Sequence, residues 1–239
     1  MRSISIFLLL SLSAATALAQ TPANPYGSEA DLKIGDIIAL QYTGDGFVAE
    51  ATNSPYEHVG MVYSINPTMV VHSSSNICPG SGQNGSCLVT LNTFLAASTA
   101  VLVARPQVMN SDRASKEAAL HQAVDNIGYV RYDFSLSNLN GALTCSPYVW
   151  QIFKNALNVE IGPRIRVKDY HFGPTANAWV SANALNYVSC INGNNTQIAI
   201  PVMLYQYPQT LIFADHPVPA WPGGNPNPSP SAHACPGTF

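Results

Sequence analysis

The chain has 239 residues, enough to bury a hydrophobic core in one or two domains. Hydrophobic residues make up 47% of it, which excludes disorder throughout, and charged residues only 10%. The net charge is −3 and there is no basic run. A nucleic-acid-binding protein needs a cationic surface against the phosphates, so the composition excludes that class. A surface of uncharged polar residues suits an extracellular protein.

The first 19 residues have the pattern of a secretory signal. Arg2 supplies a positive start, residues 4–12 are apolar, and residues 17–19 read as an A-x-A cleavage site. The apolar stretch is too short to span a bilayer, and no later window is long enough. We therefore expect a signal peptide at 1–19, no integral membrane segment after its removal, and a secreted or periplasmic location. The alternative is a buried N-terminal helix.

Five cysteines in an oxidising compartment leave at least one thiol without an intramolecular partner. Fifteen arrangements of two bridges and one free thiol are open from the sequence. Local context favours Cys78–Cys87, which encloses a turn-rich loop, and Cys190–Cys235 in the Gly/Asn/Pro-rich C-terminal part. Cys145 is then free.

The elements expected in chain order define an α+β protein. Short β-branched runs separated by turn residues indicate antiparallel strands at 34–41, 46–51, 58–65, 68–73, 87–91 and 100–105. A helix is expected after Ser111-Asp112 and up to Gly128. A second follows Cys145, with apolar residues at helical spacing over 149–157 and Pro147 in its first turn. Two more strands are expected at 164–170 and 197–204, before a Pro/Gly/Asn tail at 217–236.

Cys145 is the first candidate for chemistry because it precedes a well-formed amphipathic helix. Free N–H groups and the dipole at a helix N-terminus stabilise a thiolate, so we expect the pKa of this thiol to be lowered. A thiolate attacks acyl carbons, and the same N–H groups can hold the oxyanion. The alternative is a small buried thiol without chemistry.

Two histidines flank a predicted hairpin with Asn66-Pro67 at its turn. His58 opens the first strand and His72 ends the second. If paired residue numbers sum to 132, His72 lies opposite Gly60 and diagonal to His58, and any even sum keeps both imidazoles on one face. We expect that face to meet the Cys145 helix, with Gly60 allowing close approach. In the alternative, each is an ordinary core or surface histidine.

An odd register would separate the two histidines. The group orienting His58 would then be sought among the nearest polar residues in the sequence, which are Glu50, Glu57 and Asp36.

Five segments carry a resemblance to a known family. Residues 35–38, 57–62, 70–72, 132–133 and 145–149 read GDII, EHVGMV, VVH, YD and CSPYV. In this order they resemble the circularly permuted papain-like hydrolases, which include the YiiX-like branch of the NlpC superfamily and the lecithin retinol acyltransferase-like enzymes. Unpermuted relatives have Cys before His, whereas here His58 precedes Cys145. The resemblance spans about residues 34–160.

The resemblance implies a permuted papain-like fold: an antiparallel sheet or small barrel packed against helices over 20–175, with an irregular extension over 176–239. It also implies that Cys145 is the nucleophile, His58 its general base and His72 the residue that orients His58. The expected reaction is hydrolysis of an amide in a cell-wall peptide, so the partner is a peptide or peptidoglycan fragment. The same machinery serves a lipid or ester hydrolase or acyltransferase, and a non-catalytic secreted binding module is the competing class.

No cofactor or metal is expected. The chain has no H-E-x-x-H, no C-x-x-C and no Gly-rich phosphate loop. The pairs Asp169/His171 and Asp215/His216 are interpreted as surface features.

Overall fold

The computed structural model describes residues 29–42, 56–78, 82–96, 98–132, 142–162, 165–166, 197–198 and 209–214. The expected signal peptide, the expected strand at 46–51, Glu50, Cys190, Cys235 and the Asp/His pairs lie outside these residues. None of the helices in the described ranges is long and apolar enough to cross a membrane.

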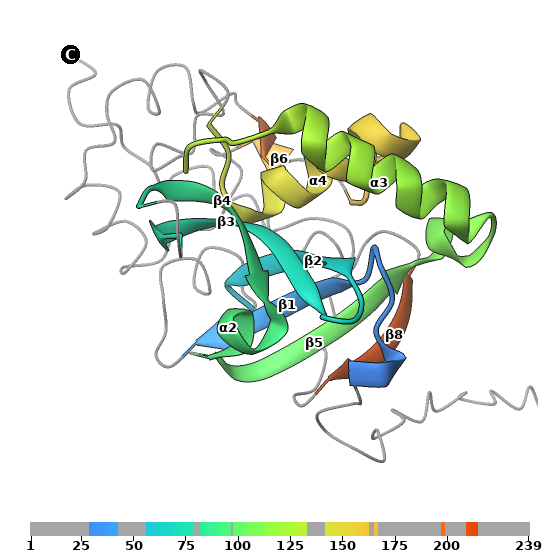
Figure 1. The fold of residues 1–239 in the computed structure, drawn as a ribbon, viewed down its shortest axis with the longest axis horizontal. Helices are drawn as coiled ribbons and strands as arrows, with labels where there is room; N and C mark the ends of the chain where they lie inside the picture. Colours follow the sequence, from blue (N-terminus) through green and yellow to red (C-terminus); the bar gives the residue numbers. More distant parts are fainter. Residues whose placement is uncertain are drawn as a thin grey trace, which may run out of the picture.

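The centre of the fold is a six-stranded antiparallel sheet in the order β4-β3-β2-β1-β5-β8 (Figure 1). Its strands are β1 (Ile37–Tyr42), β2 (His58–Ser64), β3 (Met69–Ile77), β4 (Asn84–Thr90), β5 (Ser98–Pro106) and β8 (Gln209–Ala214). The α-helices are α2 (Leu91–Leu95), α3 (Arg113–Ile127) and α4 (Cys145–Leu157), and Glu29–Asp31 and Gln107–Asn110 form short 3-10 turns. A separate pair consists of β6 (Ile165–Arg166) and β7 (Gln197–Ile198).

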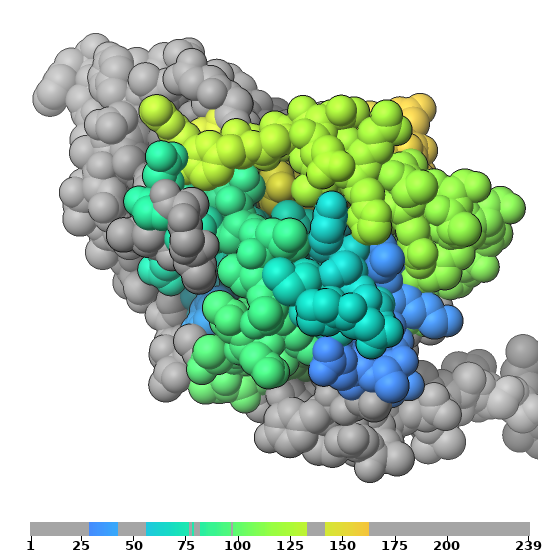
Figure 2. Space-filling model, in the orientation of Figure 1, coloured from blue at the N-terminus to red at the C-terminus, as the bar shows by residue number. Residues whose placement is uncertain are grey.

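One face of the sheet is covered by α3 and α4, which lie side by side over β2 and β3 (Figure 1). The odd-numbered residues of the strands, Ile37, Val59, Met61 and Val71, pack there against the apolar side of α4. In Figure 2 the yellow-green α3 lies over α4, of which only small areas are visible. This core buries both the start and the middle of α4.

The opposite face carries the even-numbered residues and a much smaller cover. Ile38, Leu40, Val62 and Val70 form a second core with Leu91 and Phe94 of α2. Thr90 begins this helix, since its side chain accepts a hydrogen bond from the Thr93 N–H. Among the described helices, only this one, of about one turn and a half, covers this face.

The α+β class is confirmed, and the sheet is open rather than closed into a barrel. The two principal helices form where the apolar spacing predicts them, although Asp112 makes no side-chain cap bond to α3. Neither α2 nor β8 is predicted by the sequence pattern. The strands expected at 164–170 and 197–204 are described only as the two-residue β6 and β7.

Asp36 has a structural role at the start of β1. Its carboxylate is fully buried and accepts hydrogen bonds from Arg105 Nε at 2.7 Å and from the Lys33 N–H at 2.8 Å. Arg105 also reaches the carbonyl of Asp31. This ion pair fastens the lead-in turn to β5, so Asp36 is not the group that orients His58.

The expected bridge between Cys78 and Cys87 is present, with the two Cα atoms 5.6 Å apart, and Cys145 is free. Closing this short loop stabilises the fold by about 2.5 kcal/mol in the chain-entropy estimate. The Cys190–Cys235 pairing stays a prediction.

The connection from α3 to α4 is fastened to the outer edge of β4. Ser86 donates its N–H to the Val130 carbonyl at 2.9 Å, and Gly85 forms an isolated bridge with Arg131. Gly85 has φ +149°, and a Cβ on it would lie 2.1 Å from the Val130 oxygen. Only glycine fits at this crossing.

Candidate active site

Cys145 is the first residue of α4, and its side chain is buried at 6% exposure. Thr144 precedes it in extended conformation, and the Tyr148 N–H closes the first turn on the Thr144 carbonyl. The main-chain N–H groups of Cys145 and Ser146 are directed at the sulfur, and Ser146 Oγ lies 3.7 Å from it. The thiol therefore faces the free donors of a helix N-terminus.

Strand β3 holds the residues that lead into Cys145. Ser73 Oγ, which is fully buried, donates to the Leu143 carbonyl at 2.7 Å. The Leu143 N–H in turn donates to the Arg131 carbonyl at 3.0 Å. Ser73 directly follows His72 in β3. Two adjacent residues of this strand therefore hold the two candidate groups, because His72 bonds His58 and Ser73 holds the segment that leads into Cys145. Sequence reasoning missed Ser73, since one serine in a serine-rich segment gives no signal.

The thiol lies against the main chain of β2 on both sides of His58. Cys145 Sγ is 4.0 Å from the Glu57 carbonyl oxygen, and the Val59 N–H is directed at the sulfur. Glu57 is 88 positions from Cys145 in the chain. The fold thus brings the start of α4 to the residue that opens β2.

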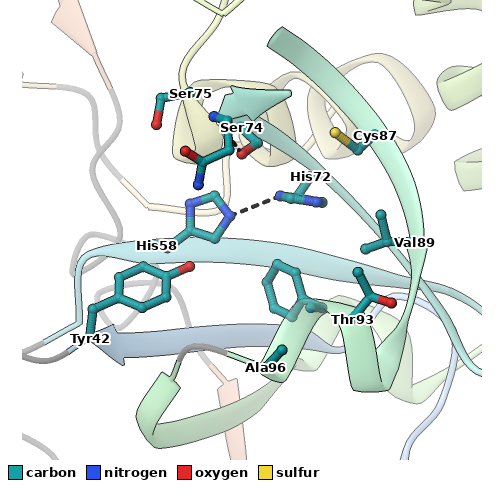
Figure 3. Close-up of a pocket in the computed structure, with 11 residues that line it drawn as sticks. Tyr42, His58, His72, Ser74, Ser75, Cys87, Val89, Thr93 and Ala96 are labelled. Atoms are coloured by element: carbon teal, nitrogen blue, oxygen red, sulfur yellow. Dashed lines mark hydrogen bonds between the residues drawn. The ribbon is translucent and has the colours of Figure 1, made fainter. Parts of the chain in front are cut away.

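The predicted register of the two histidines is confirmed. His72 pairs with Gly60, so the paired numbers are even in sum and His58 lies diagonally across from His72. His58 Nε2 and His72 Nδ1 are 2.9 Å apart, and the rings meet edge to face (Figure 3). The two imidazoles form one hydrogen-bonded pair.

The prediction that both imidazoles lie on the face of the sheet that meets the Cys145 helix is wrong. Helix α4 packs on Val59, Met61 and Val71, whereas His58 and His72 project to the α2 face, beside Phe94. Both faces of β2 and β3 are apolar, so alternation puts the histidines together without selecting the face that the helix covers.

Gly60 allows a close approach, as expected, but from α2 rather than from α4. A Cβ on Gly60 would lie 2.8 Å from Phe94 Cζ and 2.6 Å from Val70 Cγ1. The Phe94 ring occupies this space, with its centroid 5.5 Å from that of His58 and 5.0 Å from that of His72. Phe94 therefore buttresses the histidine pair.

The thiol and both imidazoles are neutral in the free protein. Burial raises the pKa of Cys145 above its ordinary value, although Ser146 and the surrounding N–H groups oppose the change. Burial and the neighbouring His72 lower the pKa of His58 to about 3, and burial lowers that of His72 to about 4. The expected lowering of the thiol pKa is wrong, because loss of hydration outweighs the donors of the helix terminus.

The hydrogen bond of the pair determines which nitrogen of His58 is free for chemistry. Nε2 is occupied by His72, which leaves Nδ1, the ring nitrogen next to the residue's own main chain. Cys145 Sγ lies at that main chain. If His58 Nε2 donates its proton to His72 Nδ1, the free lone pair of His58 is on Nδ1.

Tyr42, at the end of β1, is a site residue that sequence reasoning missed. Its ring centroid is 6.1 Å from that of His58, and Figure 3 shows its hydroxyl toward that imidazole. Burial, followed by the charges of Cys145 and Glu57, raises its pKa. The phenol therefore stays protonated, as a hydrogen-bond donor near the thiol.

A pocket of about 480 Å³ opens beside the histidine pair on the α2 face (Figure 3). His72, Cys87, Val89 and Phe94 form its buried part, whereas the exposed Ser75, Asn76, Thr93 and Ala96 surround its mouth. His58 and Tyr42 also line it. Its volume is in the range of small-ligand sites.

The thiol at the start of α4, the histidine of β2 and the second histidine bonded to it follow the permuted chain order that the resemblance implies. The family described as "permuted papain-like amidase enzyme, YaeF/YiiX, C92 family" matches residues 31–210. The chain belongs to this family, as the sequence resemblance predicts.

A solved structure supports the fold. The crystal structure of metalloprotein yiiX from Escherichia coli O157:H7 has a TM-score of 0.63 and 21% identity, over 76% of this chain and 96% of that one. No curated protein matches. The described residues of the present chain contain no group of three or more His, Cys, Asp or Glu side chains suited to a metal ion.

Proposed function

We propose that the protein is an exported cysteine amidase with Cys145 as nucleophile, His58 as general base and His72 as the residue that orients His58. The observation that carries the proposal is the meeting of α4 and β2, where Cys145 Sγ lies against the main chain around His58. Membership of an amidase family supports the amide as the bond that is cleaved.

The reaction begins from neutral groups. His58 Nδ1 takes the proton of the thiol while Sγ attacks the acyl carbon, so no preformed ion pair is needed. The N–H groups of Cys145 and Ser146 stabilise the oxyanion that develops on the acyl oxygen. His58 then protonates the departing nitrogen, which leaves a thioester on Cys145. Water, deprotonated by His58, attacks this thioester and releases the acid and the free thiol.

His72 acts through His58. Its Nδ1 accepts the proton of His58 Nε2, which keeps His58 in the tautomer with a free lone pair at Nδ1. It also stabilises the imidazolium that forms during the reaction. The pattern at residues 1–19 supports export, and a peptide of the cell wall is the substrate that the resemblance favours.

The test is labelling of the native protein with chloroacetamide, followed by peptide mass mapping. We expect the adduct on Cys145, formed faster in the wild type than in His58→Ala. The matched control is His121→Ala, in which a histidine of α3 is removed. A Cys145 found in a disulfide, or labelled equally fast without His58, would contradict the proposal.

A second measurement concerns the reaction itself. Hydrolysis of a library of acetylated peptide amides should depend on Cys145. When the enzyme is denatured during turnover to trap the acyl-enzyme, the acyl group should be found on that residue. Absence of cleavage across the library, with labelling intact, would favour the non-catalytic binding module.

A further inference from the structure

The described residues that line the pocket beside the histidine pair include none that could neutralise a charged ligand. Among the described residues that line it there is no Asp, Glu, Lys or Arg. Its two imidazoles are neutral, because burial lowers the pKa of His58 to about 3 and that of His72 to about 4. An ion inside it would lose hydration without gaining a charged partner among these residues.

The pocket changes in character from its interior to its mouth. The interior is formed by Val89, the Phe94 ring, the disulfide sulfur of Cys87 and the edge of His72, all buried. The mouth is formed by uncharged polar residues, among them the exposed Ser75, Asn76 and Thr93. This gradient suits an occupant with an apolar end inside and an uncharged polar part, such as a peptide group, at the entrance.

The position of the pocket relative to the proposed reaction indicates which part of the substrate enters it. The acyl carbon is bound at Cys145, and the oxyanion points to the N–H groups of α4. His58 must deliver its proton to the departing nitrogen, so that nitrogen lies on the His58 side of the acyl carbon. The pocket begins at the same imidazole. A substituent on the departing nitrogen is thus the nearest part of the substrate to the pocket.

We propose that this pocket is the subsite for the leaving residue of a peptide substrate, and that it selects an uncharged, apolar side chain there. The inference rests on the proposed function and adds the substrate class. It predicts cleavage within a chain before an apolar residue, because a leaving residue at the chain end would carry a free carboxylate into the same uncharged space.

The test uses acetyl-alanyl peptides that end in an amide and differ only in the leaving residue: leucine, phenylalanine, lysine or glutamate. We expect kcat/KM to favour leucine and phenylalanine over lysine and glutamate by roughly tenfold or more. The same leucine peptide with a free carboxylate should also react slowly. A second series varies the acyl-side residue and should show a smaller spread.

Two variants and one control assign the selectivity to the pocket. Asn76→Lys adds a cation at the mouth and should raise the relative rate for glutamate several-fold. Ala96→Trp should lower the rates for leucine and phenylalanine by obstructing the mouth. Leu88→Lys is the control, because Leu88 is 49% exposed on β4 and does not line the pocket.

Equal rates for all four leaving residues, a larger spread in the acyl-side series, or the same change in Leu88→Lys would overturn the inference while leaving the amidase proposal intact. Binding is measured separately by calorimetry on Cys145→Ala, so that failure of catalysis does not decide the question. Tighter binding of leucine than of lysine and glutamate peptides, weakened by Ala96→Trp, supports the pocket. Binding without this preference overturns it.

Discussion

The two faces of the sheet have similar apolar residues but very different covers. Ile37, Val59, Met61 and Val71 on one face lie under two helices of 15 and 13 residues. Ile38, Leu40, Val62 and Val70 on the other face are covered in part by α2, which has five residues. The thick cover buries the thiol of Cys145, and the thin cover leaves space for a pocket beside the imidazoles.

This difference lets β2 contact groups on both faces of the sheet that the proposed reaction uses. His58 is the first residue of β2, so the helix that covers the far face reaches the main chain there while the imidazole stays on the near face. In the proposed reaction, the face under α3 and α4 supplies the nucleophile and the oxyanion donors. The face under α2 supplies the proton acceptor and a space for substrate.

Removal of the base should separate catalysis from folding. His58→Ala is expected to lower kcat/KM by about 10³-fold, the usual range for loss of a general base. The melting temperature should change little, because His58 is only partly buried and lines the pocket. His121→Ala, which removes a histidine of α3 outside the site, should keep its activity. A loss of activity that is equal in both variants would contradict the assignment.

The activity of His72 variants should depend on which atom takes the position of Nδ1. Asparagine places its amide oxygen near the position of Nδ1, and glutamine extends one methylene too far. We therefore expect activity to fall in the order wild type, His72→Asn, His72→Gln, His72→Ala, with about a 10- to 100-fold loss for alanine. kcat should account for most of the change. Glutamine more active than asparagine would show that Nδ1 is not the contact that matters.

A side chain at Gly60 should disturb only the face of the sheet that α2 covers. Gly60→Ala places a methyl group against Phe94 and Val70, at a cost of about 1–3 kcal/mol in unfolding free energy. The displaced Phe94 should also loosen the histidine pair and reduce kcat/KM. In the double variant Gly60→Ala/Phe94→Leu, part of the stability should return. An unchanged denaturation midpoint in Gly60→Ala would contradict the close packing.

The histidine pair should make stability depend on pH. The folded pKa values of His58 and His72, about 3 and about 4, lie below the ordinary value of an unfolded histidine, about 6.5. The unfolded chain therefore binds more protons between about pH 4 and 6.5, and stability falls as pH falls through that window. Urea denaturation at pH 7 and 5 should show this fall in the wild type and in Cys145→Ala. In His58→Gln/His72→Asn it should be smaller, and an equal fall would contradict the assignment.

The sequence is sufficient to predict the parts of the site that depend on local periodicity. The alternation in His58–Ser64 and Met69–Ile77, with Asn66-Pro67 between them, predicts the register that joins the two histidines. The spacing of apolar residues predicts α4 and its start at Cys145. The bridge of Cys78 with Cys87 follows from the turn-rich loop between them.

The remaining features depend on contacts between distant segments. Which face α4 covers is not encoded in the alternation, because Val59 and Val62 are equally apolar. A helix as short as α2 shows no apolar periodicity in the sequence, yet its Phe94 occupies the space that the absence of a side chain at Gly60 leaves open. The pKa of Cys145 depends on the burial that α3 and β2 impose, and the sequence shows only the helix terminus.

The crossing at Gly85 has a consequence for how molecules of this protein behave toward one another. β4 is the outermost strand on its side of the sheet, and an outermost strand offers main-chain donors and acceptors to any second polypeptide. Here the Ser86 N–H is already engaged by Val130, and the Gly85–Arg131 bridge covers the adjoining stretch. The connection from α3 to α4 thereby also shields the strand from intermolecular pairing. Because only glycine permits this crossing, Gly85→Ala should expose the strand edge and favour association of molecules, edge against edge, as the protein concentration rises.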